Sequence, residues 1–266
     1  MYTLDDLREL MRCLRDPDSG CPWDLKQSYQ TIAPYTLEEC FELVDAIESG
    51  DTGQMRQELG DVLFQVVFYS QLAEEAGDFH YADVVDGIVR KLLRRHPHVF
   101  PAGKLERPGT TTPVSEAEIK RRWEEIKAEE RANKAQHGVL DDIPQALPSL
   151  SRAQKLQKRA AGVGFDWPSP AGVLEKLDEE RQELANAIES GGREQQAEEL
   201  GDLLFTAVNL ARHLDLDAET VLRAANRKFE SRFRHMESTT DKSLSELDSA
   251  ALEALWEQAK HSVRQI

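Results

Sequence analysis

The sequence predicts an all-α protein in which one type of helical domain occurs twice in tandem, and three observations support this prediction. Apolar residues recur at helical spacing through most of the chain, as in Leu37, Phe41, Val44 and Ile47. Short alternating runs of β-branched residues closed by Asn-Gly or Asp-Gly turns, which are typical of β-hairpins, do not occur. The third observation is an internal repeat. A shift of 141 positions lays Glu38–Val67 over Glu179–Val208 without a gap, with more than half of the aligned residues identical.

The helical pattern is interrupted at two places that divide the chain. Residues 101–113 contain three prolines, two glycines and a threonine run, and we expect a loop there. Residues 133–150 lack apolar periodicity and contain Pro144 and Pro148, so we expect a linker. The predicted domains are therefore residues 1–132 and 151–266, joined by 133–150. The helices expected in order are 3–14, 35–49, 53–76, 81–94, 115–133, 149–162, 171–190, 193–214, 217–238 and 248–263.

Composition and charge exclude several classes of protein. The 266 residues include 33 Lys+Arg and 49 Asp+Glu, which gives a net charge of −16. Binding to nucleic acid through bulk charge needs a basic surface, so stable nucleic-acid binding is not expected. The longest apolar runs are too short for a membrane span, and the acidic N-terminal residues do not resemble a signal peptide. Three cysteines without a C-x-x-C pattern indicate free thiols and a cytoplasmic location.

Acidic residues form the same pattern in both halves of the repeat. Each half contains E-E-x-x-E followed by E-x-x-D, and acids three or four residues apart share one helix face. In each half the acids are symmetric about the turn between the two helices, at Gly50 and at Gly191. Residues equidistant from the turn of an antiparallel helical hairpin lie level with each other, so the four acids should meet. The predicted metal ligands are Glu39, Glu42, Glu58 and Asp61 in the first half, and Glu180, Glu183, Glu199 and Asp202 in the second.

Four facing carboxylates repel one another unless a cation is present, and all-oxygen ligands favour Mg²⁺, with Mn²⁺ as a possible substitute. A solvent-exposed acidic helix face is the simpler alternative, but the symmetry about both turns argues against it. A di-iron site is not expected, because it needs Glu-x-x-His pairs, which are absent at these positions.

Cations and tryptophans also recur in both halves. Lys91 and Arg95 match Lys228 and Arg232, and residues at i and i+4 can form one cationic ridge for a polyphosphate. Trp256 matches a tryptophan of the first half, and either stacking on a base or helix packing would explain it. Trp23 and Trp167 precede the acidic motifs, where a loop lining a pocket is expected.

The chain resembles the MazG nucleoside triphosphate pyrophosphohydrolases. The resemblance rests on stretches such as Gly20-Cys21-Pro22-Trp23-Asp24, Thr31 to Glu39, Gly60 to Val67, Arg94 to Phe100, Val163 to Trp167 and Gly201 to Phe205, and covers nearly the whole chain. It implies a homodimer, formed through helical bundles, that hydrolyses NTPs or dNTPs to the monophosphate and pyrophosphate with magnesium, consistent with cleaning of the nucleotide pool. A narrower dUTPase or phosphoribosyl-ATP pyrophosphohydrolase, or a nucleotide-sensing or partner-binding regulatory protein, is the alternative.

The resemblance also implies roles for individual residues. The C-terminal domain would be the main catalytic one, with Lys176, Lys228, Arg232 and Trp256 contacting the nucleotide. We expect Glu179, beside the predicted ligands, to act as the general base. The shift of 141 places Lys176 over Tyr35, so the first half lacks one cation that the second half supplies.

Overall fold

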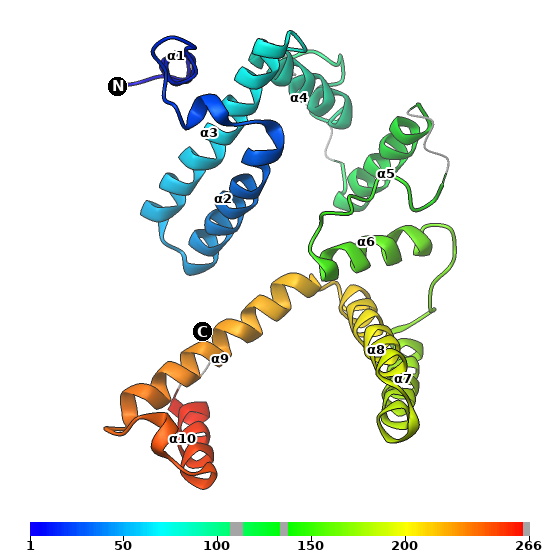
Figure 1. Cartoon of the computed structure of the whole chain (residues 1–266). Coiled ribbons are helices and arrows are strands. Elements are labelled where there is room, and N and C mark those ends of the chain that lie inside the picture. Colours follow the sequence, from blue (N-terminus) through cyan, green and yellow to red (C-terminus); the bar gives the residue numbers. More distant parts are fainter. Residues whose placement is uncertain (107–113, 134–137, 263–266) are drawn as a thin grey trace. The chain divides into compact units, whose positions relative to one another are not determined.

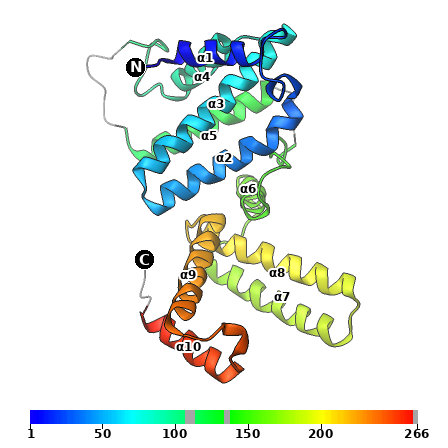
Figure 2. The same ribbon diagram turned by 60° about the vertical axis from the view of Figure 1, so that its left-hand side comes forward.

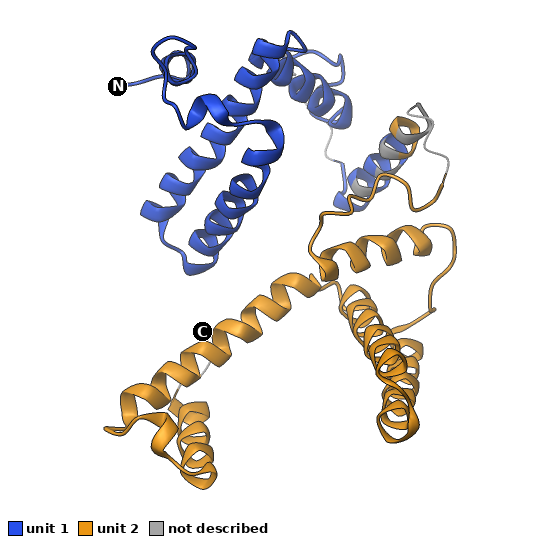
Figure 3. Cartoon of the chain, in the orientation of Figure 1, with its two compact units in different colours: residues 1–126 blue, residues 127–266 orange. Residues whose placement is uncertain are grey.

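The computed structural model describes residues 1–106, 114–133 and 138–262, in which ten α-helices and two short 3₁₀ helices occur and no strand is present. The chain divides into two compact units, residues 1–126 and 127–266 (Figure 3). The predicted all-α, duplicated fold is confirmed, whereas the limits at residues 132 and 151 stay a prediction. None of the described helices combines the length and the hydropathy that a membrane span requires.

Unit 1 is built on an antiparallel helical hairpin. Helices α2 (Tyr29–Ser49) and α3 (Thr52–Ala76) run side by side in both views (Figures 1 and 2). Helix α1 (Leu4–Leu14) packs on α3, and the core of the unit includes Met11 of α1, Ile32 of α2 and Phe68 of α3. The unit is completed by the 3₁₀ helix η1 (Asp24–Lys26), by α4 (Tyr81–Arg95) and by the first part of α5 (Glu116–Asn133).

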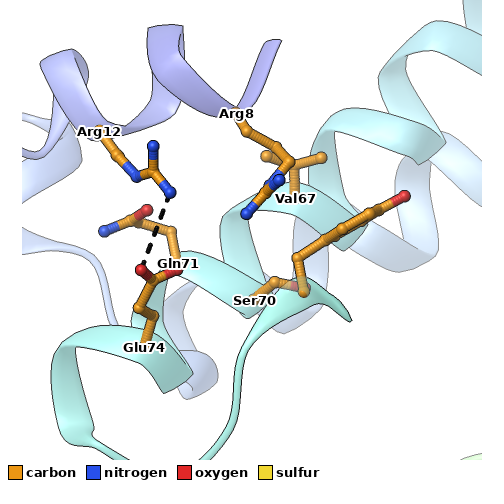
Figure 4. Close-up of a pocket in the computed structure, with 7 residues that line it drawn as sticks. Arg8, Arg12, Val67, Ser70, Gln71 and Glu74 are labelled. Atoms are coloured by element: carbon orange, nitrogen blue, oxygen red, sulfur yellow. Dashed lines mark ion pairs between the residues drawn. The ribbon is translucent and has the colours of Figure 1, made fainter. Parts of the chain in front are cut away.

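Polar contacts add to the apolar contact between α1 and α3. Arg12 reaches Glu74 at 3.8 Å across a small pocket that is also lined by Arg8 and Ser70 (Figure 4). Arg15 pairs with Glu75 at 2.6 Å, and its guanidinium also donates to the backbone oxygen of Asp24 at 2.5 Å. These contacts hold the loop before α2 against the end of α3.

Unit 2 repeats the hairpin with α7 (Pro170–Ser190) and α8 (Arg193–His213), which also run side by side (Figures 1 and 2). Helix α6 (Ser149–Ala161) packs on α8 and on α9 (Ala218–Thr239). Gln157 of α6 donates to the backbone oxygen of Phe205, and Gln154 donates to that of Leu216. Helix α10 (Ser249–Ser262) follows η2 (Leu244–Glu246) and packs on α9.

The two hairpin turns reverse the chain with different residues and different backbone conformations. In unit 1, Gly50 adopts φ 74°, a left-handed conformation that favours glycine, and Asp51 caps α3 through the amides of Gly53 and Gln54. In unit 2, Gly191 and Gly192 both have extended backbone, and Gly192 is the N-cap of α8. Each turn therefore leaves its helices antiparallel and level.

Nine of the ten expected helices agree with the structure to within one residue; residue 263, the expected end of the last helix, lies outside the described residues. The expected helix 35–49 was wrong at its start, because α2 begins six residues earlier at Tyr29. Ser28 and Thr31 form a reciprocal capping box, in which each side chain accepts from the other's amide. This cap and the tertiary packing outweigh the hydrogen bond that Pro34, inside the helix, cannot donate.

Candidate functional site

The two hairpins bring predicted metal ligands together in both units. In unit 2, one carboxylate oxygen from each of Glu180, Glu199 and Asp202 lies within 4.8 Å of the others. In unit 1, one carboxylate oxygen from each of Glu39, Glu58 and Asp61 likewise lies within 4.8 Å of the others. In each set the first glutamate comes from the first helix of the hairpin, α2 or α7. The other two acids come from the second helix, α3 or α8. We call these sets, with Glu183 and Glu42 respectively, the acidic clusters of unit 2 and unit 1.

The fourth predicted acid lies beside each set. The carboxyl of Glu42 shares a hydrogen bond with that of Glu58, and Glu183 is close enough to repel Glu199 electrostatically. Each cluster also includes one nearly buried carboxyl, because Glu58 is 7% exposed and Glu180 is 5% exposed. A buried carboxylate surrounded by other carboxylates is unfavourable by itself.

Burial and mutual repulsion raise the pKa of several cluster acids. The pKa of Glu39 is raised by desolvation and by the charges of Asp61, Glu42 and Glu58. Desolvation, followed by the neighbouring acids, also raises the pKa of Glu58 and of Glu199. All these groups would be stabilised in their charged form by a cation bound among them.

A single cation distinguishes the two clusters. Lys176 of α7 places its Nζ 2.8 Å from Glu179 and 2.9 Å from Glu180. Its hydrogen bond to Glu179, with a smaller contribution from its hydrogen bond to Glu180, raises the pKa of the lysine, which therefore stays protonated. Tyr35 occupies the corresponding position of α2, as the repeat predicts, and cannot supply this charge.

The other predicted nucleotide contacts form a second group on α9 and α10. The guanidinium of Arg232 lies over the ring of Trp256 at 5.8 Å from the centroid, and Phe229 packs on the same ring at 5.4 Å. Lys228, one turn before Arg232, is exposed. Helix α9 packs on α6 and α10 and touches α8. Of the predicted cations, Lys176 is thus the one that the structure pairs with the acids of α7.

Unit 1 contains a counterpart of this second group. The indole nitrogen of Trp123 donates to the backbone oxygen of Arg95 at 2.7 Å, and His96 packs edge-on against the indole at 5.4 Å. Each unit thus joins its cationic helix to a tryptophan from the following helix. The helix-packing role of these tryptophans, which the sequence left open, is present in both units.

Both acidic clusters have the donor chemistry that a hard divalent cation requires. The oxygens come from carboxylates alone, they lie close together, and one carboxylate in each cluster is withdrawn from water. Mg²⁺ and Mn²⁺ prefer such oxygen ligands. The residues of both acidic clusters therefore fit a hard divalent cation such as Mg²⁺ or Mn²⁺.

Comparison with known proteins accounts for this duplicated arrangement. The family model of the MazG nucleotide pyrophosphohydrolase domain matches residues 27–100 and again residues 169–237. The chain belongs to the MazG family. It is 49% identical to the nucleoside triphosphate pyrophosphohydrolase of Escherichia coli strain K12 over 98% of both chains. It is also 44% identical to a nucleoside triphosphate pyrophosphohydrolase/pyrophosphatase MazG of Thermotoga maritima, over 96% of this chain and 95% of the relative.

The MazG segments contain both hairpins and the helices that carry Lys91 and Lys228, whereas Trp123 and Trp256 lie beyond them. Sequence reasoning missed one feature just before the second segment, which begins at residue 169. Asp166 lies in the loop before α7 and accepts hydrogen bonds from Arg212 and, at 3.0 Å, from His213 at the end of α8. The sequence signal was weak, because these residues are far apart in the chain and nothing in the acidic motif points to them.

Proposed function

We propose that this MazG-family protein hydrolyses nucleoside or deoxynucleoside triphosphates to the monophosphate and pyrophosphate, and that unit 2 carries the main site. The observation that supports this most is the lysine built into the acidic cluster of unit 2. Lys176 joins two carboxylates of one helix face, so the same surface offers ligands for a cation and a fixed positive charge for phosphate. The family and the activities for which its relatives are named support the reaction class.

In this proposal Glu180, Glu183, Glu199 and Asp202 would hold Mg²⁺, with Mn²⁺ as a substitute, and Glu39, Glu42, Glu58 and Asp61 would do so in unit 1. When bound, the ion would supply positive charge for the polyphosphate and Lewis acidity towards water. The chain itself would supply the remaining chemistry.

Glu179 is placed to take a proton. Its side chain is 58% exposed, in contrast to the nearly buried Glu180 next to it, and its carboxylate therefore faces solvent. We propose that this carboxylate accepts the proton of the attacking water. Lys176, already hydrogen-bonded to it, would hold the base in place and exchange one of these contacts for a phosphate oxygen.

Lys228 and Arg232 would neutralise the charge of the pyrophosphate leaving group. Trp256 supports this role through Arg232, because the indole under the guanidinium restricts its orientation. A residue held in this way loses less conformational entropy when it binds a phosphate.

We further propose a homodimer in which hairpins pair into helical bundles. Large apolar residues are exposed at equivalent positions of both hairpins: Ile47 and Ile188, Leu59 and Leu200, Leu63 and Leu204 are between 40% and 63% exposed. Apolar side chains that recur on the same exposed face of two units are typical of an interface. In the cell the proposed role is removal of unwanted nucleotides from the pool.

The experiment is a measurement of pyrophosphate release from a panel of NTPs and dNTPs, with Mg²⁺ and with a chelator. Glu180→Ala and Glu183→Ala should abolish release, because each removes a proposed ligand of the main site. Glu39→Ala and Glu42→Ala are matched controls at the equivalent positions of unit 1, and most of the release should persist. Release that survives in the unit 2 variants and is lost in Glu39→Ala would assign the main site to unit 1. An absence of release from any triphosphate with wild-type protein would refute the proposed activity.

A further inference from the structure

Trp167, in the loop before α7, lies directly on the first turn of that helix. A Cβ atom added to Gly172 would come within 2.8 Å of Cδ1 of the Trp167 indole, closer than such contacts allow. The indole can lie there because residue 172 has no side chain. Trp167 is nevertheless 38% exposed, so part of its ring is open to solvent.

The contact at Gly172 places the indole on the same face of α7 as the acidic cluster. At about 100° per residue, the side-chain directions of residues 172, 176, 179, 180 and 183 fall within an arc of about 100°. Along this stripe the order is Trp167 over Gly172, then Lys176, then Glu180. The rise from residue 172 to residue 180 is about 12 Å. A nucleoside triphosphate is elongated in the same sense, with a charged end and an aromatic end.

The loop that carries Trp167 is anchored at the neighbouring residue. Asp166 accepts from Arg212 and His213 of α8 and also, at 2.9 Å, from the amide of Trp167. Arg212 in turn donates to Asn209, which is 3% exposed. Asp166 therefore acts as a positioning residue, which fixes the backbone of Trp167 relative to both helices of the hairpin.

Trp256 is less suited to stacking on a base, because Phe229 and Arg232 already pack on its ring. The loop tryptophan of unit 1 is arranged in a similar way to Trp167. Trp23 packs edge-on against Tyr35 at 5.9 Å, and Tyr35 lies one turn before Glu39 of the acidic cluster. Both copies of the repeat thus place a loop tryptophan beside the helix face that leads to the carboxylates.

From this geometry we propose that Trp167 is the surface on which the nucleobase of the substrate stacks in the unit 2 site. The inference rests on the proposed function, because it assumes that the triphosphate lies along the stripe. Stacking on an aromatic ring tolerates every base. Trp167 would therefore provide affinity for nucleotides in general, with little discrimination among bases.

The first test measures binding without turnover. An ATP analogue with a methylene bridge between its α- and β-phosphates is titrated in the presence of Mg²⁺, and base-free tripolyphosphate is titrated in parallel. Trp167→Ala should weaken the analogue about five-fold to a hundred-fold, the range of base–aromatic stacking, and Trp167→Phe should retain most of the affinity. Binding of tripolyphosphate should change less than two-fold. Phe165→Ala is the matched control, because Phe165 belongs to the same loop and is 80% exposed.

The second test leaves the tryptophan in the chain. Gly172→Ala should push the indole away and weaken the analogue as Trp167→Ala does, although alanine is the better helix former and should not destabilise α7. Equal affinity of wild type, Trp167→Ala and Gly172→Ala for the analogue would overturn the inference. So would an equal loss of affinity for tripolyphosphate, since that loss would indicate general damage. A failure of the proposed activity would be seen separately, as wild-type protein that binds the analogue but releases no pyrophosphate.

Discussion

Replacement of Lys176 by methionine tests the electrostatic balance of the unit 2 cluster. Methionine keeps the length and helix propensity of the side chain and removes its charge. Glu180, which is 5% exposed, would then lose the cation 2.9 Å from its carboxylate and remain among like charges. We expect the variant to be less stable than wild type when no divalent ion is present.

The size of the effect follows from the geometry. At 2.9 Å and an effective dielectric constant of about 20, the attraction between Nζ and the Glu180 carboxylate is about 6 kcal/mol. Desolvation offsets most of it, and Lys176 is itself 31% exposed. The net loss should lie between the values for exposed pairs and for buried pairs that lose one partner, at about 2 kcal/mol. For a chain of this size that corresponds to a fall in Tm of about 4–8 °C.

The assay is thermal unfolding of wild type and Lys176→Met, with a chelator and again with saturating Mg²⁺. Because a bound divalent ion replaces the missing charge, Mg²⁺ should raise the Tm of the variant more than that of wild type. Lys155→Met is the matched control, since Lys155 is an exposed lysine on α6 of the same unit. The reasoning is refuted if Mg²⁺ raises the Tm of both proteins equally, or if Lys176→Met costs no more stability than Lys155→Met.

Three further predictions follow from the structure. Glu179→Gln should retain affinity for nucleotide and reduce kcat by about 10²–10⁴-fold, as measured by pyrophosphate release; an unchanged kcat would exclude Glu179 as the base. Burial of Asp166 opposes its ionisation, but hydrogen bonds from Arg212 and His213 outweigh this and hold its pKa below the usual value. The ionised Asp166 carboxylate therefore contributes its full stabilisation above about pH 5, and this contribution is lost as the pH falls through the folded-state pKa. The difference in Tm between wild type and Asp166→Asn should disappear in acid. A difference that stays constant with pH would contradict this prediction. Leu204→Glu should shift the protein from dimer to monomer in analytical ultracentrifugation, and an unchanged mass would argue against the proposed hairpin pairing.

Much of the fold could be predicted from the sequence because local signals agree with the tertiary structure. Apolar spacing gave the helices and the repeat gave their pairing, since identical residues at a constant shift must occupy equivalent environments. The start of α2 could not be predicted in this way. A proline normally lies in the first turn of a helix or beyond its end, whereas here Ser28 and Thr31 cap a helix that begins six residues before the expected start and contains Pro34.

The acidic clusters could be predicted because symmetry about a hairpin turn translates directly into spatial proximity. The contacts of Asp166 could not be predicted, because its partners Arg212 and His213 lie 46 and 47 residues away in the chain. Nor could the sequence predict that the guanidinium of Arg232 would lie over the ring of Trp256. That arrangement depends on the packing of α9 against α6 and α10, which no residue spacing records.

The two units show how one substitution can separate the properties of duplicated sites. Both units retain their carboxylates, so the carboxylate charges alone would give the two clusters the same affinity for a cation. In unit 1 the position of Lys176 is taken by Tyr35, and desolvation together with repulsion by the neighbouring acids raises the pKa of Glu39, the counterpart of Glu180. A cation should therefore relieve more repulsion in unit 1, whereas a polyphosphate should find an additional positive charge in unit 2. If this argument is correct, Tyr35→Lys should weaken binding of Mg²⁺ alone to unit 1 and strengthen binding of tripolyphosphate there. The reciprocal change, Lys176→Tyr, should have the opposite effects in unit 2.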